Sequence, residues 1–469
     1  MQGAGVSEAA DPLAALLAEA SADEQAGRLD AAEARLAAAL RQAPDHPHAL
    51  HLSGIVAFRR GREDDAQALM ERSIALAPDV ALYHRNICAI YRALGRLEEG
   101  REAGLRAIAL APDDPHAYAN LAIIHYDLLE LEAGLACSDR ALELSPELPD
   151  AHFERAEVLL LRGMLDEGWD EYEWRFKLPQ AGRMLPKGEV PQWDGERRND
   201  GRLLLIGDQG FGDVIQFARY IPWAAARWPE IVAACSAEMR PILAQFPQIA
   251  SIHDRWEEVP SFDAYCPLSG LPRLAGTRAA NIPGTVPYLQ ADPERALHWS
   301  GRLDRLLPPD LPRVALAWAG RPAHNNDRNR STTLDRLAPI LAVPGVAFVS
   351  LQKGPARSGI GTYFGAAPLL NLGPSLETFA DTMAVLACVD LVIAVDTSVV
   401  HLAGAMARPV WTLLPFAPDW RWLLNRPDTP WYPTMRLYRQ AAPRAWDELA
   451  GRVAADLAGF RDKIQRPRA

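Results

Sequence analysis

The sequence predicts an α-helical solenoid followed by two α/β domains, and three observations carry this prediction. Proline recurs with a strict period in the amino-terminal third of the chain. From Arg202 onward, short apolar runs alternate with helical segments, which is typical of parallel sheets with helical crossovers. Between the two patterns, residues 178–201 are rich in proline and glycine, as expected of an irregular connector.

The amino-terminal third repeats every 34 residues, at Pro44, Pro78, Pro112 and Pro146. This is the length of one tetratricopeptide helix–turn–helix unit. Small residues recur in two phases where the paired helices of a repeat must approach closely: Ala20, Gly54, Cys88, Ala122 and Ala156, then Ala32, Ala66, Gly100, Gly134 and Gly168. About five repeats therefore fill residues 1–177, and such a solenoid offers a concave binding surface.

Two asparagines mark the expected groove of the solenoid. Asn86 and Asn120 lie one period apart on the first helices of consecutive repeats, with Leu52 and Glu154 in register on either side. Asparagine amides can hold the backbone of an extended peptide, so a peptide groove is one interpretation. A pair of solvated asparagines is the other.

The rest of the chain is expected to form two Rossmann-like domains. The first covers residues 202–290, and the second covers residues 313–469 and ends in a helix. Residues 291–312, with several prolines and one helix candidate, are expected to link them beside a cleft. Strands are predicted at 203–206, 231–235, 249–252, 314–318, 346–351, 369–372, 391–395 and 410–414.

The turn after the first of these strands is the first candidate for chemistry. Gly207-Asp208-Gln209-Gly210-Phe211-Gly212-Asp213 opens a helix whose N-terminus presents free N–H groups. Glycines allow close backbone approach there, so Gln209, Gly210 and Gly212 form a predicted acceptor loop. Asp213 is the candidate general base for an acceptor hydroxyl. The alternative is a tight turn in which Asp213 only caps the helix.

Polar residues also follow strands of the second half. Asp396, Thr397 and Ser398 lead into a helix that carries His401, and this geometry suits a diphosphate. The alternative is a plain helix cap with a packed histidine. Further candidate donor-binding residues follow other strands or come from an aromatic cluster that could equally be core: Arg328, Gln352, Lys353 and Trp420. Loops after parallel strands meet at one edge of a sheet, so these residues are expected to converge.

Composition limits the function classes. A net charge of −11, from 60 acidic and 49 basic residues, argues against a general nucleic-acid binder. The five cysteines are scattered without a CxxC pair, and no Asp-x-Asp dyad occurs, so we expect no disulfide framework and no metal site. The first residues lack a signal-peptide pattern and no apolar run is long enough to span a bilayer, which favours a cytoplasmic protein.

Several motifs resemble the heptosyltransferase-like glycosyltransferase family. They are Gly212-Asp213, Arg328-Asn329-Arg330-Ser331, Ser350-Leu351-Gln352-Lys353-Gly354, the run Val395 to Gly404, and Pro418-Asp419-Trp420-Arg421-Trp422-Leu423-Leu424 continuing to Trp431-Tyr432-Pro433-Thr434. The resemblance covers most of residues 202–460. It implies a GT-B fold, with residues 202–290 as the acceptor-side domain and residues 313–469 as the donor-binding domain. It also implies metal-independent transfer from a nucleotide sugar with inversion. It also implies that Asp213 stands in the place of the base and Asp396 to His401 in the place of the donor-diphosphate site. Ser398 stands where that family usually has glycine, so the donor is expected to differ.

The plan of repeats before a GT-B domain is also similar to the protein O-linked N-acetylglucosamine transferases. Some bacterial chains of this type are associated with flagellin glycosylation. The leading hypothesis is therefore transfer of a sugar to a serine or threonine hydroxyl of a protein recruited by the groove, with a nucleotide sugar as co-substrate and no other cofactor. Two alternatives stay open: a lipid or polysaccharide acceptor, or a non-catalytic adaptor whose GT-B half senses a sugar nucleotide.

Overall fold

The computed structural model describes residues 11–178, 185–283, 285–324 and 326–463. Parts of the predicted solenoid, connector and donor-binding domain therefore lie outside the described residues. The chain divides into two compact units, Met1–Val158 and Leu159–Ala469. In the part of the chain that the structure describes, no helix combines the length and apolar character needed to cross a bilayer.

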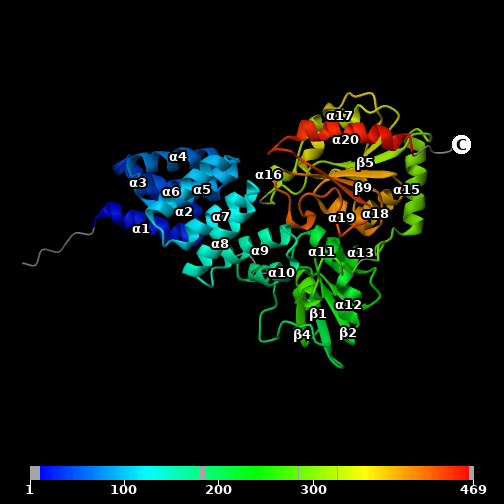
Figure 1. The fold of residues 1–469 in the computed structure, drawn as a ribbon, viewed down its shortest axis with the longest axis horizontal. Coiled ribbons are helices and arrows are strands. Elements are labelled where there is room, and N and C mark those ends of the chain that lie inside the picture. The colour runs from blue at the N-terminus through cyan, green and yellow to red at the C-terminus, as the bar shows by residue number, and fades with distance from the viewer. Residues whose placement is uncertain (1–10, 179–184, 284, 325, 464–469) are drawn as a thin grey trace, which may run out of the picture. The chain divides into compact units, whose positions relative to one another are not determined.

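The first unit is a run of paired helices (Figure 1). The described helices are α1 (Pro12–Gln25), α2 (Leu29–Gln42), α3 (Pro47–Arg59), α4 (Glu63–Leu76), α5 (Ala81–Leu94), α6 (Leu97–Leu110), α7 (Pro115–Asp127), α8 (Leu131–Leu144) and α9 (Pro149–Leu161), which crosses the unit boundary. Each even-numbered helix from α2 to α8 stops at a cap residue directly before a periodic proline: Ala43, Ala77, Ala111 and Ser145. Residues before proline disfavour the helical conformation, so the period sets where these helices end. The predicted solenoid is confirmed.

The periodic small residues lie where helices of the first unit meet. Ala32 and Ala66 have no exposed surface. A methyl group added to Gly54 would lie 2.9 Å from Cγ of Met70, and one added to Gly100 would lie 2.9 Å from Cδ1 of Ile124. Larger side chains at these positions would push the helices apart, which explains their recurrence.

Helix α10 (Leu165–Tyr172) and the short helix η1 (Glu173–Lys177) belong to the second unit, although the sequence pattern assigned them to the last repeat. Trp169 donates from Nε1 to the carbonyl of Thr277 at 3.0 Å. Arg175 donates to Oγ of Ser269 at 2.6 Å. These bonds explain the difference, because the decayed repeat packs on the first sheet domain.

The first sheet has parallel strands in the order β3-β2-β1-β4. Its elements are β1 (Arg202–Ile206), α11 (Phe211–Phe217), η3 (Ala218–Tyr220), α12 (Ile221–Ala225), β2 (Glu230–Ala234), α13 (Arg240–Leu243), β3 (Ile249–His253), β4 (Ala264–Pro267) and α14 (Leu271–Leu274). The connector covers the free edge of β4, since Trp193 donates its backbone N–H to the carbonyl of Tyr265 at 2.8 Å. Trp193 is 3% exposed and packs against Trp223, so its ring docks the connector on the first sheet domain.

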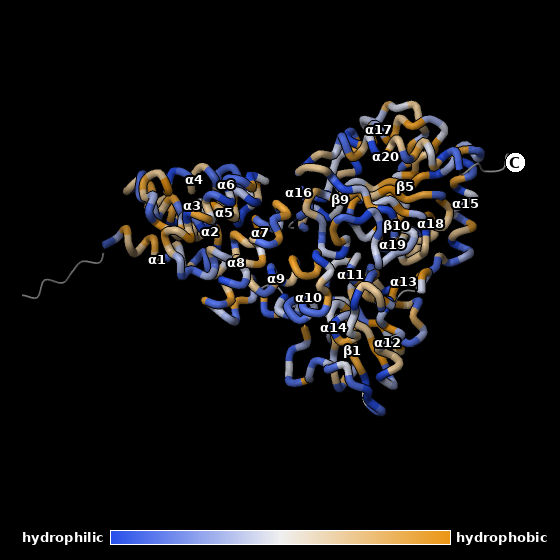
Figure 2. Tube along the Cα trace, in the orientation of Figure 1, coloured by the Kyte–Doolittle hydropathy of each residue, from blue (hydrophilic) through white to orange (hydrophobic). Residues whose placement is uncertain are grey.

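The second sheet is also parallel, with strand order β10-β9-β8-β5-β6-β7. Its elements are α15 (Pro293–Leu306), β5 (Arg313–Ala317), α16 (Asp327–Arg330), α17 (Ala338–Leu341), β6 (Ala347–Ser350), β7 (Leu369–Asn371), α18 (Phe379–Ala387), β8 (Leu391–Val395), α19 (Ser398–Ala405), β9 (Val410–Leu414), η10 (Trp420–Trp422), β10 (Met435–Arg439) and α20 (Trp446–Arg461). Helices α17 and α20 cover one face, with α18 and α19 on the other (Figure 1). Strand β5 is fully buried and mostly apolar, which is typical of a central parallel strand (Figure 2).

Strand order reverses at β1 in the first sheet and at β5 in the second. In open parallel sheets, ligands bind beyond the carboxyl ends of the strands at such switch points. A ligand site is therefore expected at the loops that follow β1, β5 and β8.

Candidate functional site

Two of these loops open helices that touch each other. A methyl group on Gly212 in α11 would lie 2.8 Å from Cδ2 of His401 in α19, so only glycine permits this approach. The contact brings the first turn of α11 and the first turn of α19 together. The structure therefore joins the predicted acceptor loop to the predicted diphosphate segment.

Asp213 lies in the first turn of α11 and forms an ion pair with Nη2 of Arg421. Arg421 also donates from Nη1 to both oxygens of Asp419, each at 2.8 Å. The Arg421 side chain is 8% exposed and that of Asp213 is 21% exposed. Burial raises the pKa of Asp213, and the Arg421 charge opposes that rise. A carboxyl group with a raised pKa beside a cation is suited to take a proton.

The other acid of the same loop serves the fold. Asp208 is buried and accepts hydrogen bonds from the N–H of Ser269 at 3.2 Å and from its hydroxyl. Gln209 lies within hydrogen-bond distance of the Tyr172 hydroxyl, at 3.0 Å. With its amide turned to satisfy all neighbours, Gln209 donates to Oδ1 of Asp213 at 3.2 Å. Only Asp213 of the two acids therefore faces the second sheet domain.

The segment Asp396 to His401, predicted to bind a diphosphate, has buried side chains that bond to the protein itself. Asp396 accepts a hydrogen bond from Nε1 of Trp422 at 2.9 Å, and its Oδ1 lies 3.9 Å from Nε2 of His401. The other ring nitrogen of His401 lies 3.0 Å from the Tyr432 hydroxyl. Burial, together with Arg421, lowers the pKa of His401, so the imidazole is neutral near pH 7. The packed-histidine alternative therefore describes His401 well.

Burial raises the pKa of Asp396 to about 6, and the nearby Asp419 charge adds to this effect. A carboxyl group that is more basic folded than unfolded stabilises the fold at low pH, and this contribution is lost as pH rises through about 6. Asp396→Asn is expected to raise the free energy of unfolding at pH 7.5 by about 2 to 3 kcal/mol. The asparagine can still accept from Trp422. Urea unfolding followed at pH 4.5 and pH 7.5 checks the prediction.

The matched control is Asp335→Asn, which removes an exposed carboxylate of the same domain. This change should alter stability by less than about 0.5 kcal/mol at either pH. A gain for Asp396→Asn of the same size at both pH values would contradict the raised pKa.

Two buried polar atoms near this edge have no hydrogen-bond partner among the described residues: Thr397 Oγ1 and Arg421 Nε. Thr397 is the cap residue of α19, yet its side chain makes no capping bond. The plain-cap alternative for Thr397 is therefore wrong. Buried polar groups left unpaired cost free energy, and their gathering at a switch point is typical of a ligand site.

Several predicted donor residues are occupied by the protein itself. The Gln352 amide makes four bonds, to the N–H groups of Trp318 and Ala319 and to the carbonyls of Ala319 and Lys353. Gln352 therefore holds the loop after β5 in place. Lys353 donates from Nζ to the carbonyl of Leu376 at 2.6 Å. Arg328 lies exposed in α16, the same short helix that carries Arg330.

Trp420 is 1% exposed, so no ring face remains for a nucleobase. Its ring lies edge-on to Trp169 at 5.2 Å and to Tyr172 at 5.8 Å, with the Arg421 guanidinium 4.2 Å from its centre. Trp420 is therefore a core residue. The prediction that its ring stacks on a nucleobase is wrong.

The two groove asparagines bond within the first unit. Asn86 lies 2.9 Å from Nε2 of His51, and Asn120 donates to the carbonyl of Arg85 at 3.1 Å. Each amide links one first helix to the preceding first helix. They are therefore not a solvated pair, and one donor of each amide is already used inside the solenoid.

Arg421 is the functional candidate that sequence reasoning missed. It lies in one of the family-like motifs, in which only its neighbour Trp420 is a predicted donor-binding residue. The signal was present, because Asp419-Trp420-Arg421-Trp422 places opposite charges two residues apart between tryptophans that must be buried. A charge in a buried aromatic segment needs a partner, and that partner is the predicted base.

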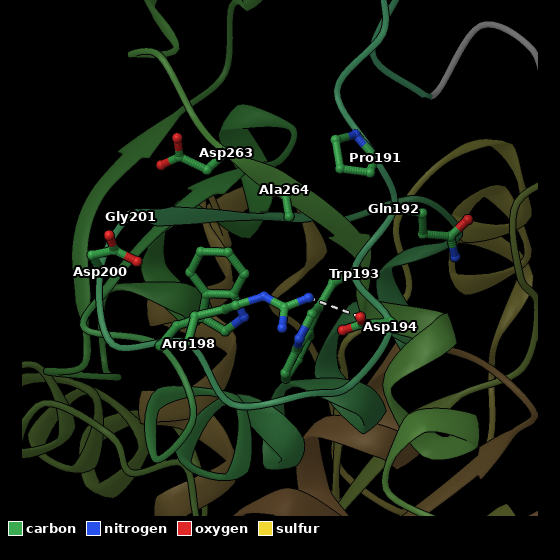
Figure 3. A pocket seen from close by; sticks show the side chains of 10 residues that line it. Pro191, Gln192, Trp193, Asp194, Arg198, Asp200, Gly201, Asp263 and Ala264 are labelled. Atoms are coloured by element: carbon green, nitrogen blue, oxygen red, sulfur yellow. Dashed lines mark hydrogen bonds and ion pairs between the residues drawn. The ribbon is translucent and has the colours of Figure 1, made fainter.

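A cavity of about 390 Å³ lies at the opposite end of the first sheet (Figure 3). It borders Gly201 and Asp263, which precede β1 and β4, and the ion pair of Arg198 with Asp194 stands at its wall. Ligands of parallel sheets bind at the carboxyl ends, so this cavity is separate from the candidate site. Among the described residues, no group of three or more His, Cys, Asp or Glu side chains could hold a metal ion.

Comparison with known proteins agrees with both halves of this description. Residues 23–89 match the tetratricopeptide repeat model, and residues 367–419 match the model of glycosyltransferase family 9 (heptosyltransferase). The second match runs from β7 through the segment Asp396 to His401 and ends at Asp419. One chain therefore combines tetratricopeptide repeats with a segment similar to glycosyltransferase family 9.

A curated relative of this chain is Protein FlbA of Caulobacter vibrioides, 30% identical over 339 residues. The match spans 66% of this chain and 55% of that protein, so the chain spans little more than half the length of this relative. Similar solved structures include TTC0263, a thermophilic TPR protein of Thermus thermophilus, with 21% identity, 36% of this chain, 92% of that chain and a TM-score of 0.33. Another is pilF of Pseudomonas aeruginosa, with 17% identity, 38% of this chain, 78% of that chain and a TM-score of 0.33.

Proposed function

We propose that this protein is an inverting, metal-independent glycosyltransferase that moves a sugar from a nucleotide sugar to a serine or threonine hydroxyl of a protein acceptor. The observation that carries the proposal is the contact of α11 with α19 at Gly212 and His401. It sets the candidate base, Asp213, beside the helix terminus where a donor diphosphate would bind.

In this mechanism, Asp213 takes the acceptor proton on Oδ2, because Oδ1 receives the bond from Arg421. The acceptor oxygen forms a bond to the anomeric carbon while the bond from that carbon to the diphosphate oxygen breaks. The leaving diphosphate keeps the electron pair, and attack from the opposite face inverts the configuration. Its charge would be stabilised by the α19 N-terminus, by the remaining donors of Lys353, and by Arg328.

The groove of the first unit would recruit the acceptor polypeptide. Tetratricopeptide solenoids present one continuous surface built from successive first helices, which suits an extended segment of chain. Flagellin is one acceptor to test, alongside unglycosylated total protein from the source cell.

The proposal predicts a nucleotide-selective thermal shift. Unfolding is followed with UDP, GDP, CMP, ADP and dTDP, and one of them should raise the melting temperature by about 2–4 °C at a hundred times its Kd. Thr397→Val should abolish this shift, because it removes the unpaired hydroxyl at the α19 N-terminus while keeping the side-chain shape.

The control is Thr412→Val in β9, which removes another buried, partnerless hydroxyl but lies inside the sheet. It should leave the nucleotide shift intact. No shift with any nucleotide would refute a working donor site and favour the adaptor alternative. An equal loss in both variants would show that the response does not depend on the α19 terminus.

A further inference from the structure

The first helices of the solenoid are joined by a repeating polar contact. Asn86 of α5 reaches back to His51 of α3, and one period later Asn120 of α7 donates to the carbonyl of Arg85 in α5. Another period later, the residue in register is Glu154 of α9. The equivalent carbonyl would be that of Ala119, and a carboxylate has no hydrogen to donate to it.

Glu154 is accordingly left unsatisfied. It is 9% exposed, and its Oε2 is buried without a hydrogen-bond partner in the described part of the chain. A buried ionised carboxylate without a partner is costly, so this position is unfavourable for the solenoid alone. Replacement of Glu154 by an amide residue, like the asparagines of the two preceding repeats, would remove the free-energy cost of this buried charge.

The charges around Glu154 do not compensate for it. Glu157 and Asp150 of α9 and Asp127 of α7 act on it, and Arg92 of α5 acts in the opposite direction. That cation is already paired with Asp127 at 2.6 Å. Burial and the adjacent Glu157 raise the pKa of Glu154 well above its ordinary value. We call the four acids Asp127, Asp150, Glu154 and Glu157 the acidic end of the first-helix face.

The other end of the same face has the opposite character. His48, His51 and Tyr83 stack there, with His48 and His51 5.9 Å apart and His51 and Tyr83 4.5 Å apart. Neighbouring Arg85 contributes a positive charge, paired with Asp114. Among the first helices from α3 to α9, acidic residues occur only in α7 and α9.

We propose that the acidic end binds a lysine or arginine side chain of a partner polypeptide, whose cationic group bonds to the buried carboxylate of Glu154. The partner would be the acceptor, so this inference rests on the proposed function in that one respect. A cation from the partner supplies both the missing hydrogen-bond donor and the missing charge. An extended segment with a basic residue would thus be fixed in register along the groove.

The test is fluorescence anisotropy of the full-length protein with three labelled peptides, which repeat Gly-Ser-Lys, Gly-Ser-Arg or Gly-Ser-norleucine. At least one cationic peptide should bind about tenfold more tightly than the norleucine peptide. Glu154→Gln should abolish that preference. Glu102→Gln, which removes an exposed carboxylate from a second helix, should preserve it.

Equal binding of all three peptides, or an unchanged preference in Glu154→Gln, would overturn the proposal. The melting temperature, followed by circular dichroism, is the control for misfolding. Glu154→Gln should unfold at the same temperature as the wild type or higher. The assay contains no nucleotide sugar. If the peptides discriminate but no nucleotide shifts the melting temperature, the acidic end binds cations and the proposed transferase function fails.

Discussion

Arg421→Ala is expected to lower the free energy of unfolding by about 3 to 5 kcal/mol. Arg421 is the cation that Asp213 and Asp419 share, and its side chain is 8% exposed. Truncation leaves the Asp213 carboxylate buried without its partner and also removes the guanidinium that stacks on Trp420 at 4.2 Å. All thirteen tryptophans of the chain lie between Trp169 and Trp446, so tryptophan emission during urea unfolding reports on the second unit alone.

The pH dependence of this loss identifies its cause. Burial already raises the pKa of Asp213 in the presence of Arg421, and removal of the cation raises it further. The deficit should be largest above pH 8, where Asp213 must ionise, and should shrink as pH falls and the carboxyl protonates. Arg336→Ala is the control, because its pair with Asp447 is solvent-exposed and should contribute less than about 1 kcal/mol. A similar small loss in both variants would contradict a buried, essential ion pair.

Asp213→Asn is expected to lower the turnover number for sugar transfer by about a hundredfold to ten-thousandfold, with a much smaller change in the donor KM. The amide keeps the shape of the side chain but cannot take the acceptor proton. Transfer is measured as incorporation of labelled sugar into protein, with the nucleotide sugar selected by the thermal-shift series. In the wild type, the rate should fall as pH decreases through a pKa above the ordinary aspartate value, because the base must be ionised.

Asp419→Asn separates the chemical role of Asp213 from its structural one. Both aspartates hold Arg421, so both asparagine variants weaken the same cation network. Only Asp213 lies at the α11 terminus that meets α19. Equal rate losses in the two variants would mean that Asp213 only positions Arg421, and the base would have to be found elsewhere.

The features that the sequence predicted well are those set by local chemistry. The periodic prolines mark the helix ends of the solenoid, and apolar runs such as Leu391–Val395 mark the central strands. The two strands that were not predicted, β4 and β10, are edge strands. Met435–Arg439 contains two arginines, and Ala264–Pro267 ends at a proline, so neither gives the continuous apolar signal of a buried strand.

The site was harder to predict because its pairs are distant in sequence. Asp213 and Arg421 are 208 residues apart, and no local pattern links them. The glycine at Gly212 indicated close backbone approach, but not that the approaching group would be His401. Similarly, Gln352 looked like a ligand residue by its place after a strand, yet its amide is used to hold the loop after β5.

The contact between Gly212 and His401 also constrains how the second unit can move. The two sheet domains meet there with no side chain between the α11 backbone and the imidazole, and Arg219 fastens them nearby through the carbonyl of Trp431 at 2.9 Å. A rotation of one sheet domain against the other that keeps this contact must therefore pivot close to this point, since sliding would produce a steric clash. In such a rotation, atoms near the pivot move least and atoms far from it move most. Loops far from it could then swing to admit and release substrates, while the spacing between Asp213 and the α19 terminus stays nearly constant through the cycle.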